Sequence, residues 1–117
     1  MADIDAVIEH RSQYAVEVLS HYTPVAAAYL FGSWVEGIAD EWSNIDLAIF
    51  LEGIESWDLA TRAHTAALVQ EKAGDDIKLH FFSARSLHQP EPASFAAYVL
   101  THGIAITPQE GSGSLDM

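Results

Sequence analysis

Residues 29–50 read YLFGSWVEGIADEWSNIDLAIF and contain an apolar run that stops abruptly at Gly32-Ser33. Glycine lets a backbone approach a phosphate closely, and exposed amides together with the Ser33 hydroxyl can donate hydrogen bonds to phosphate oxygens. After ten further residues, Asn44 and Asp46 open a second apolar run. Residues i and i+2 of a strand share a face, so these two side chains are predicted to point the same way. Two carboxylates in that arrangement would hold Mg²⁺ beside phosphates gripped by the turn.

Apolar runs on both sides of this passage predict the other strands and the first helix. A helical period from Ile4 to Leu19 indicates an amphipathic helix that ends at Thr23-Pro24. The alanine-rich run before Gly32 is ambiguous between helix and strand, but its short length between Pro and Gly favours a buried strand. The predicted strands are 25–31, 45–51, 77–82 and a small edge strand at 104–106.

A short helix is predicted directly after Gly32-Ser33, and two more helices follow from capping and breaking signals. Ser56 is the predicted N-cap of a helix with Asp58 in its first turn and Gly74 just past its end. Pro90 and Pro92 precede a short helix predicted over 93–101. The chain is therefore predicted to be α+β, a small mixed β-sheet with helices packed on one face.

Length and composition indicate one soluble domain. We expect this domain to span residues 1–107 and the Gly-Ser-rich tail 108–117 to be disordered. No apolar run is long enough for a membrane span, and no signal peptide is evident, so the expected location is cytoplasmic. Cysteine is absent, which excludes thiolate metal sites and thiol nucleophiles.

The charge balance bears on the kind of partner. Seventeen acidic residues against five basic ones give a formal net charge of −12. Nucleic-acid binding needs clustered Lys and Arg, so direct binding of RNA or DNA is not expected. An acidic surface fits a basic protein partner or simply solubility, and the sequence leaves both open.

The spacing Gly-Ser, ten residues, then Asn-x-Asp resembles the signature of the DNA polymerase β-type nucleotidyltransferase superfamily, in particular its small antitoxin-like members. That signature has Asp-x-Asp where this chain has Asn44-Ile45-Asp46. Gly37 and Ser43 also stand where the family usually has Gly and Ser, and the resemblance extends over residues 4–106.

The resemblance implies both an activity and a partner. Active members transfer a nucleoside monophosphate from a nucleoside triphosphate, using two Mg²⁺ ions held by three carboxylates. Many small members act as antitoxins paired with an all-helical HEPN toxin, and some attach AMP to a toxin tyrosine. Carried over to this chain, Gly32, Ser33 and Gly37 become the predicted nucleotide-binding residues, and Asp46 with Asn44 the predicted catalytic and metal-binding pair.

Three departures from the family pattern argue against activity. Asn44 replaces a metal-binding Asp, Lys78 is the best match for the third carboxylate, and Glu36 stands just before the second glycine where members often carry a basic residue. Asn44, Asp46 and Lys78 together have no net formal charge, so they should bind Mg²⁺ poorly. Lys78 is expected to pair with Asp46 or to touch a phosphate, and Asp76 would be a substitute ligand only if the strand register differed by two.

Simpler interpretations of these residues remain open. Ser33 is also a plausible N-cap, Asp46 a solvated strand residue and Asn44 a turn former. His64 and His80 are expected to be ordinary surface or core histidines. Trp34 and Trp42 flank the site, where packing is the default interpretation and base stacking by Trp34 the alternative.

The sequence thus predicts a nucleotidyltransferase-family protein with weakened or lost transfer that acts as an antitoxin-like module. Its expected partner is a HEPN-like toxin or a second copy of itself. The alternative is an active enzyme that uses Mg²⁺ and ATP to move a nucleoside monophosphate to a protein or other acceptor. A metal-free nucleotide-binding regulator is a third option.

Overall fold

In a computed structural model that describes residues 5–107, a four-stranded mixed sheet forms the centre of the chain. The strand order is β3-β2-β1-β4, with β1 antiparallel to both β2 and β4 and β2 parallel to β3. The strands are β1 (Val25–Phe31), β2 (Ile45–Leu51), β3 (Ile77–Ser83) and β4 (Ile104–Ala105). The predicted α+β class with a small mixed sheet is confirmed, and β1 and β2 have the predicted bounds.

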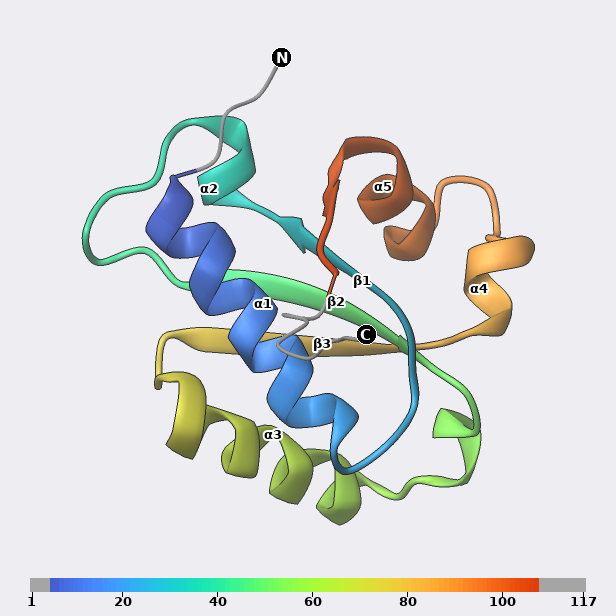
Figure 1. Ribbon diagram of the computed structural model, residues 1–117. Coiled ribbons are helices and arrows are strands. Elements are labelled where there is room, and N and C mark those ends of the chain that lie inside the picture. The colour runs from blue at the N-terminus through green and yellow to red at the C-terminus, as the bar shows by residue number, and fades with distance from the viewer. Residues whose placement is uncertain (1–4, 108–117) are drawn as a thin grey trace, which may run out of the picture.

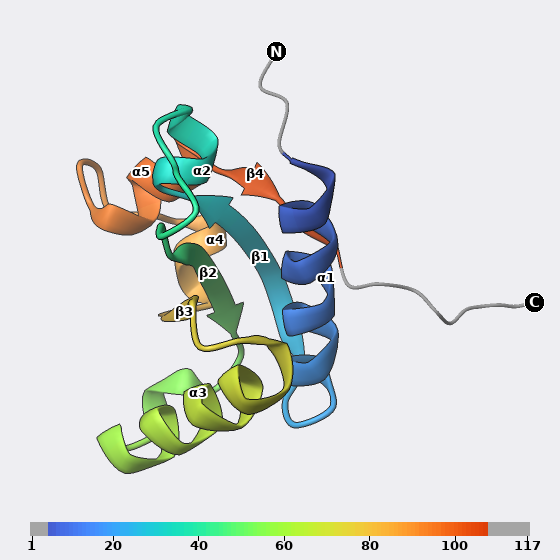
Figure 2. The same ribbon diagram turned by 90° about the vertical axis from the view of Figure 1, so that its left-hand side faces the viewer.

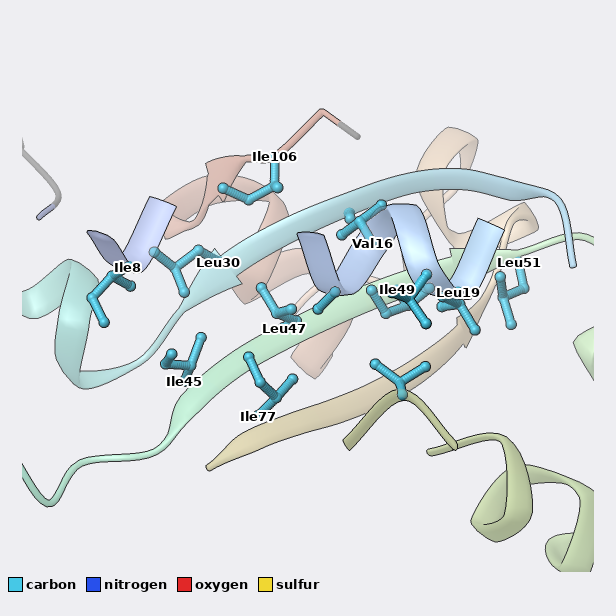
Figure 3. Packing of buried hydrophobic residues seen from close by; sticks show 14 of the residues in the cluster. Ile8, Val16, Leu19, Leu30, Ile45, Leu47, Ile49, Leu51, Ile77 and Ile106 are labelled. Atoms are coloured by element: carbon cyan, nitrogen blue, oxygen red, sulfur yellow. The ribbon is translucent and has the colours of Figure 1, made fainter. Parts of the chain in front are cut away.

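Two long helices, α1 (Ala6–Ser20) and α3 (Leu59–Ala73), cover one face of the sheet (Figures 1 and 2). The strand residues that face them belong to the main core, in which Val16 and Leu19 of α1 and Val69 of α3 are fully or almost fully buried. Figure 3 shows Val16 and Leu19 of α1 beside Ile49 and the other labelled strand residues. Alternate residues of β2, including Ile45, Leu47 and Ile49, point into this core, so Asp46 lies on the opposite face.

That opposite face is only partly covered. The short helix α5 (Phe95–His102) packs Ala96 and Val99 against Phe31, Ala48 and Phe50. The expected single helical layer therefore describes the two long helices, whereas α5 lies on the other side. A four-residue helix, α4 (Arg85–His88), connects β3 to this region and was not predicted.

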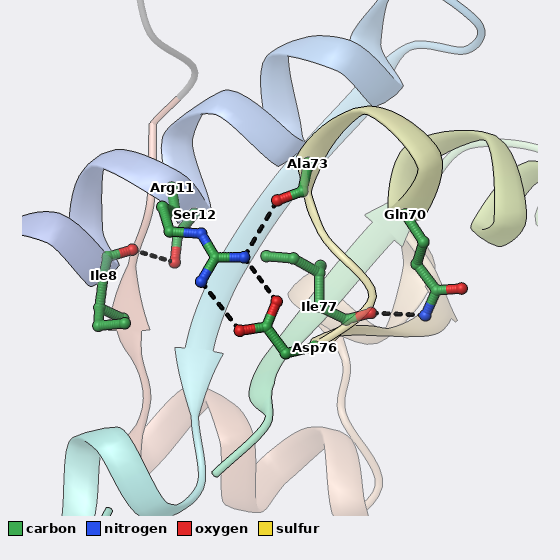
Figure 4. Close-up of polar contacts among 7 residues, drawn as sticks. All are labelled: Ile8, Arg11, Ser12, Gln70, Ala73, Asp76 and Ile77. Atoms are coloured by element: carbon green, nitrogen blue, oxygen red, sulfur yellow. Dashed lines mark hydrogen bonds and ion pairs between the residues drawn. The ribbon is translucent and has the colours of Figure 1, made fainter. Parts of the chain in front are cut away.

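Polar contacts fix the two long helices to the sheet (Figure 4). Arg11 of α1 donates to the Asp76 carboxylate at 2.9 and 2.5 Å and to the Ala73 carbonyl at 3.1 Å. Gln70 of α3 donates to the carbonyl of Ile77 at 2.7 Å, where β3 begins. These contacts set the position of α1 and α3 relative to the start of β3.

Two details of the sequence-based elements need correction. Asp58, not Ser56, is the N-cap of α3, because its side chain accepts a hydrogen bond from the Thr61 amide at 2.8 Å. Ser56 lies instead in a 3₁₀ turn, η1 (Ile54–Ser56). The last helix starts at Phe95 rather than at residue 93, since Ala93 has a positive φ of 64° that interrupts helical geometry. The predicted tail at 108–117 lies outside the described residues.

Candidate functional site

Gly32 ends β1 in a conformation that only glycine adopts readily. Its φ of 85° and ψ of −151° lie in a region that is essentially closed to other residues. A Cβ atom at this position would stand 2.8 Å from Oδ2 of Asp46. Because Phe31 pairs with Asp46 across the two strands, the turn after β1 is brought against the Asp46 carboxylate. The predicted proximity of the glycine turn and Asp46 is present in the structure.

The turn continues into helix α2 (Ser33–Glu36). Gly32 is its N-cap, and the amides of Val35 and Glu36 both donate to the Gly32 carbonyl at 3.0 Å. Ser33 is therefore the first helical residue, and the interpretation of Ser33 as an N-cap is wrong. Gly37 ends the helix in a left-handed conformation with φ of 83°. The phosphate-binding roles of Ser33 and Gly37 stay predictions.

The Asp46 carboxylate is hydrogen-bonded to His80 of β3. His80 Nε2 lies 3.1 Å from Asp46 Oδ1, and both side chains are roughly one-third exposed. The carboxylate accepts, so the contact requires a proton on Nε2. Aromatic rings hold the imidazole in place, with Phe31 at a centroid distance of 5.1 Å and Phe95 at 6.2 Å. His80 was expected to be an ordinary histidine, whereas the structure makes it the direct partner of the predicted catalytic carboxylate.

Lys78 lies directly opposite Asp46 in the parallel register, as predicted. The expected Lys78–Asp46 ion pair is nevertheless replaced by the His80–Asp46 contact, and the Lys78 side chain is exposed. The Lys78 ammonium group is strongly hydrated and would lose part of its hydration shell on pairing with Asp46. The His80 imidazole, by contrast, is already held in position by Phe31 and Phe95. Strand parity indicated that Lys78 and His80 share a face but not which of them reaches the carboxylate.

Asp76 is already engaged in a different contact and does not replace the missing carboxylate. Its two carboxylate oxygens accept hydrogen bonds from the Arg11 guanidinium in a bidentate ion pair, called the Arg11–Asp76 fork below. This contact lowers the pKa of the Asp76 carboxyl below its ordinary value. The strand register places Lys78, not Asp76, beside Asp46. The substitute-ligand alternative therefore has no support.

Glu36 and Trp34 complete the surroundings of the turn. The Tyr98 hydroxyl of α5 donates to Glu36 Oε2 at 3.0 Å, and this contact raises the pKa of Tyr98. Trp34 packs against the main core, which agrees with the packing interpretation. Its indole Nε1 is buried and has no hydrogen-bond partner among residues 5–107. A negative Glu36 beside the turn adds repulsion toward a phosphate.

The residues present do not fit a pair of magnesium ions. Mg²⁺ prefers octahedral oxygen ligands and usually one or two carboxylates. Here Asp46 supplies the only carboxylate of the predicted set, its neighbours in register are an amine and an imidazole, and Asn44 is exposed just before β2. Among residues 5–107, no three His, Asp or Glu side chains come together as a metal site would require.

Comparison with known proteins places the chain in one family. The profile of the family described as polymerase beta, nucleotidyltransferase matches residues 13–110. None of the curated proteins matches the chain.

Two solved structures share the fold. The first is the crystal structure of a candidate nucleotidyltransferase from Sulfolobus solfataricus, with 14% identity and a TM-score of 0.63, covering 94% of this chain and 88% of that one. The second is the crystal structure of a toxin-antitoxin with AMP-PNP, with 23% identity and a TM-score of 0.58, covering 88% of this chain and 75% of that one.

Within the described residues, none of the helices has the length and apolar character needed to cross a membrane.

Proposed function

Because the chain belongs to the polymerase β-type nucleotidyltransferase family, we propose that it acts as an antitoxin-like, partner-binding module in which nucleotidyl transfer is weakened or lost. The observation that carries this proposal is the group formed by Asp46, His80 and Lys78, called the Asp46 cluster below. Its single carboxylate is bonded to His80 and faces Lys78 in register. An amine and an imidazole therefore stand beside Asp46, where the reaction of the family needs anionic ligands for a metal ion.

Charge explains why this cluster disfavours transfer. A nucleoside triphosphate brings several negative charges, and divalent cations normally neutralise them during phosphoryl and nucleotidyl transfer. With Asn44 and Lys78 in place of carboxylates, only Asp46 remains to hold such a cation, and His80 already takes one of its oxygens. Glu36 brings a further negative charge near the turn. ATP binding with Mg²⁺ should therefore be weak.

Binding to a protein partner is supported by the overall charge and by a structural neighbour. A formal net charge of −12 favours association with a basic protein and disfavours a second copy of the same chain. One of the solved structures with this fold is a toxin-antitoxin with AMP-PNP. On this chain the proposed partner is a HEPN-like, all-helical toxin, and self-association is the less favoured arrangement.

Co-expression with the product of the adjacent gene tests the partner. The two proteins should co-elute from size-exclusion chromatography with a light-scattering mass equal to a hetero-complex. Separate elution at micromolar concentration, with this chain at its monomer mass, would contradict the antitoxin-like role.

An active, Mg²⁺-dependent nucleotidyltransferase is the second candidate, and the intact glycine turn against Asp46 favours it. Incubation with α-labelled ATP, Mg²⁺ and the co-purified partner measures transfer directly. This candidate requires label on the acceptor that Asp46→Asn abolishes. Absence of label, together with no calorimetric binding of Mg-ATP, supports the weakened module instead.

A further inference from the structure

The segment between α2 and β2 exposes two large apolar side chains. Trp42 is 83% exposed and Ile38 72% exposed. The default expectation that Trp42 packs into the fold is therefore wrong. Trp34 and Trp57, by contrast, pack against the main core. Figure 1 shows this segment bowing outward from the end of α2 before it enters β2.

Hydrogen bonds hold the exposed tryptophan in a defined turn. Asp40 Oδ1 accepts from the Trp42 amide at 2.9 Å and from the Ser43 hydroxyl at 3.2 Å. The Ser43 hydroxyl accepts from the Asp40 amide, and the Ser43 amide donates to the Asp40 carbonyl, both at 3.0 Å. The Ile38 amide donates to the Ser33 carbonyl at 3.2 Å, which fixes the start of the segment to α2. Such ordering before binding reduces the entropy lost on association.

The turn and the stretch of sequence around it carry charge of one sign. Residues 12–61 contain eight Asp or Glu and no Lys or Arg. Asp40 and Glu41, which flank Trp42, are both exposed. Nucleic acid and anionic membranes are repelled by such a surface, and so is a second copy of this acidic chain. A basic protein is attracted to it.

We propose that Trp42 and Ile38 form the anchor of a docking surface for a basic protein partner. The partner offers an apolar pocket for the indole, rimmed by Lys or Arg side chains that face Asp40 and Glu41. Exposed tryptophans that become buried are frequent energetic centres of interfaces, and charged rims act mainly on the association rate. This inference rests on the proposed function as a partner-binding module and assigns where the partner sits, beside the strand that carries Asp46.

Trp42→Ala tests the anchor, with Leu59→Ala as the matched control. Leu59 is 82% exposed, about as much as Trp42, but it begins α3 after β2 whereas Trp42 precedes β2. Both variants should keep the wild-type circular dichroism because neither side chain is buried. The probe is the purified product of the adjacent gene, titrated onto each variant by calorimetry. Trp42→Ala should weaken the complex at least about tenfold and Leu59→Ala less than about twofold.

Two further measurements examine the same contact without deleting the side chain. Complex formation should protect wild-type fluorescence from acrylamide, and Trp42→Phe should lose this protection because Trp34 and Trp57 are already packed. Glu41→Lys should slow association and flatten its dependence on salt.

The outcomes separate this inference from the proposed function. If wild type forms no complex, both are overturned. If wild type binds and Trp42→Ala binds within about twofold of it, the docking surface is overturned and the module remains. If wild type dimerises alone and Trp42→Ala abolishes the dimer, the surface serves a second copy and the basic-partner assignment is overturned.

Discussion

At the scale of single residues, Gly32 carries the most demanding backbone requirement in the site. Gly32→Ala should lower the free energy of unfolding by about 2–4 kcal/mol, since it combines a Gly-only backbone region with a Cβ contact of 2.8 Å to Asp46 Oδ2. Gly53→Ala is the control, because Gly53 has a similar φ of 77° but open space around it. It should cost only about 1–2 kcal/mol. Urea unfolding measures both, and equal losses would show that the Asp46 contact is unimportant.

The Asp46 cluster makes a second prediction at this scale. Wild type should show no heat of Mg²⁺ binding up to millimolar concentration, because one carboxylate bonded to His80 is a poor site. Asn44→Asp combined with Lys78→Glu should create measurable binding, since a carboxylate at position 78 then lies opposite Asp46 and a third carboxylate stands two residues before Asp46 in the chain. Adding His80→Ala should strengthen it by freeing Asp46 Oδ1.

The matched control for this gain combines Asn44→Asp with Lys72→Glu. Lys72 is an exposed residue near the end of α3, so the net charge changes equally while the cluster keeps Lys78. Calorimetry that finds equal Mg²⁺ affinity in the two double variants would attribute the gain to overall charge and not to the cluster.

At the scale of elements, the Arg11–Asp76 fork ties α1 to the segment that enters β3. Asp76→Asn should cost about 0.5–1 kcal/mol at neutral pH, a modest value because both side chains are partly exposed. The Asp76 pKa is lowered in the folded chain mainly by the hydrogen bond from Arg11. Its contribution is therefore present above the ordinary Asp pKa of about 3.9 and is lost as the pH falls through the lower folded value.

The difference between wild type and Asp76→Asn should accordingly shrink below about pH 4. Asp75→Asn is the control, since Asp75 is exposed and lies outside the fork. Denaturant unfolding at several pH values follows both variants. A wild-type advantage that persists at the acid end of the series would show that the fork stabilises through packing and not through charge.

Sequence patterns predicted the elements whose signals are local. Pro24 and Gly32 bound β1, and a dense run of branched and aromatic residues defines β2, so both strands were located correctly. α4 was missed because its four residues are too few to show a helical period and no glycine turn precedes it, whereas the equally short α2 was indicated by the turn at Gly32-Ser33. The N-cap of α3 was misplaced by two residues, because Ser56 and Asp58 are both good caps and only the 3₁₀ turn before Asp58 decides between them.

The candidate site was also predicted only in part, because some of its contacts depend on residues from several elements. The spacing of the motif indicated that the Gly32 turn lies near Asp46, whereas the resemblance to the family placed Lys78 beside Asp46, and the strand register agrees with both. The choice of His80 over Lys78 depends on Phe31 and Phe95, which come from two other elements and support the imidazole ring. Such tertiary support leaves no pattern within a single segment.

At the scale of the whole molecule, the formal charge of −12 should make stability depend on salt. Acidic side chains repel one another in the compact state, and this repulsion is relieved by unfolding. Raising NaCl from about 10 to 100 mM shortens the screening length from roughly 30 to 10 Å. The repulsion then falls, and the melting temperature should rise by a few degrees, which corresponds to roughly 0.5–1 kcal/mol for a chain of this size.

A variant with Glu52→Gln, Glu71→Gln and Glu91→Gln separates screening from other effects of salt. All three side chains are exposed, so their neutralisation leaves the core and the Asp46 cluster unchanged. This variant should melt higher than wild type at low salt and gain less from added NaCl, because less repulsion remains to be screened. Scanning calorimetry across the salt series compares the two slopes. Parallel slopes would mean that salt acts through general solvation, and the surplus of acidic residues would then have its main consequence in the attraction of a basic partner rather than in the stability of the fold.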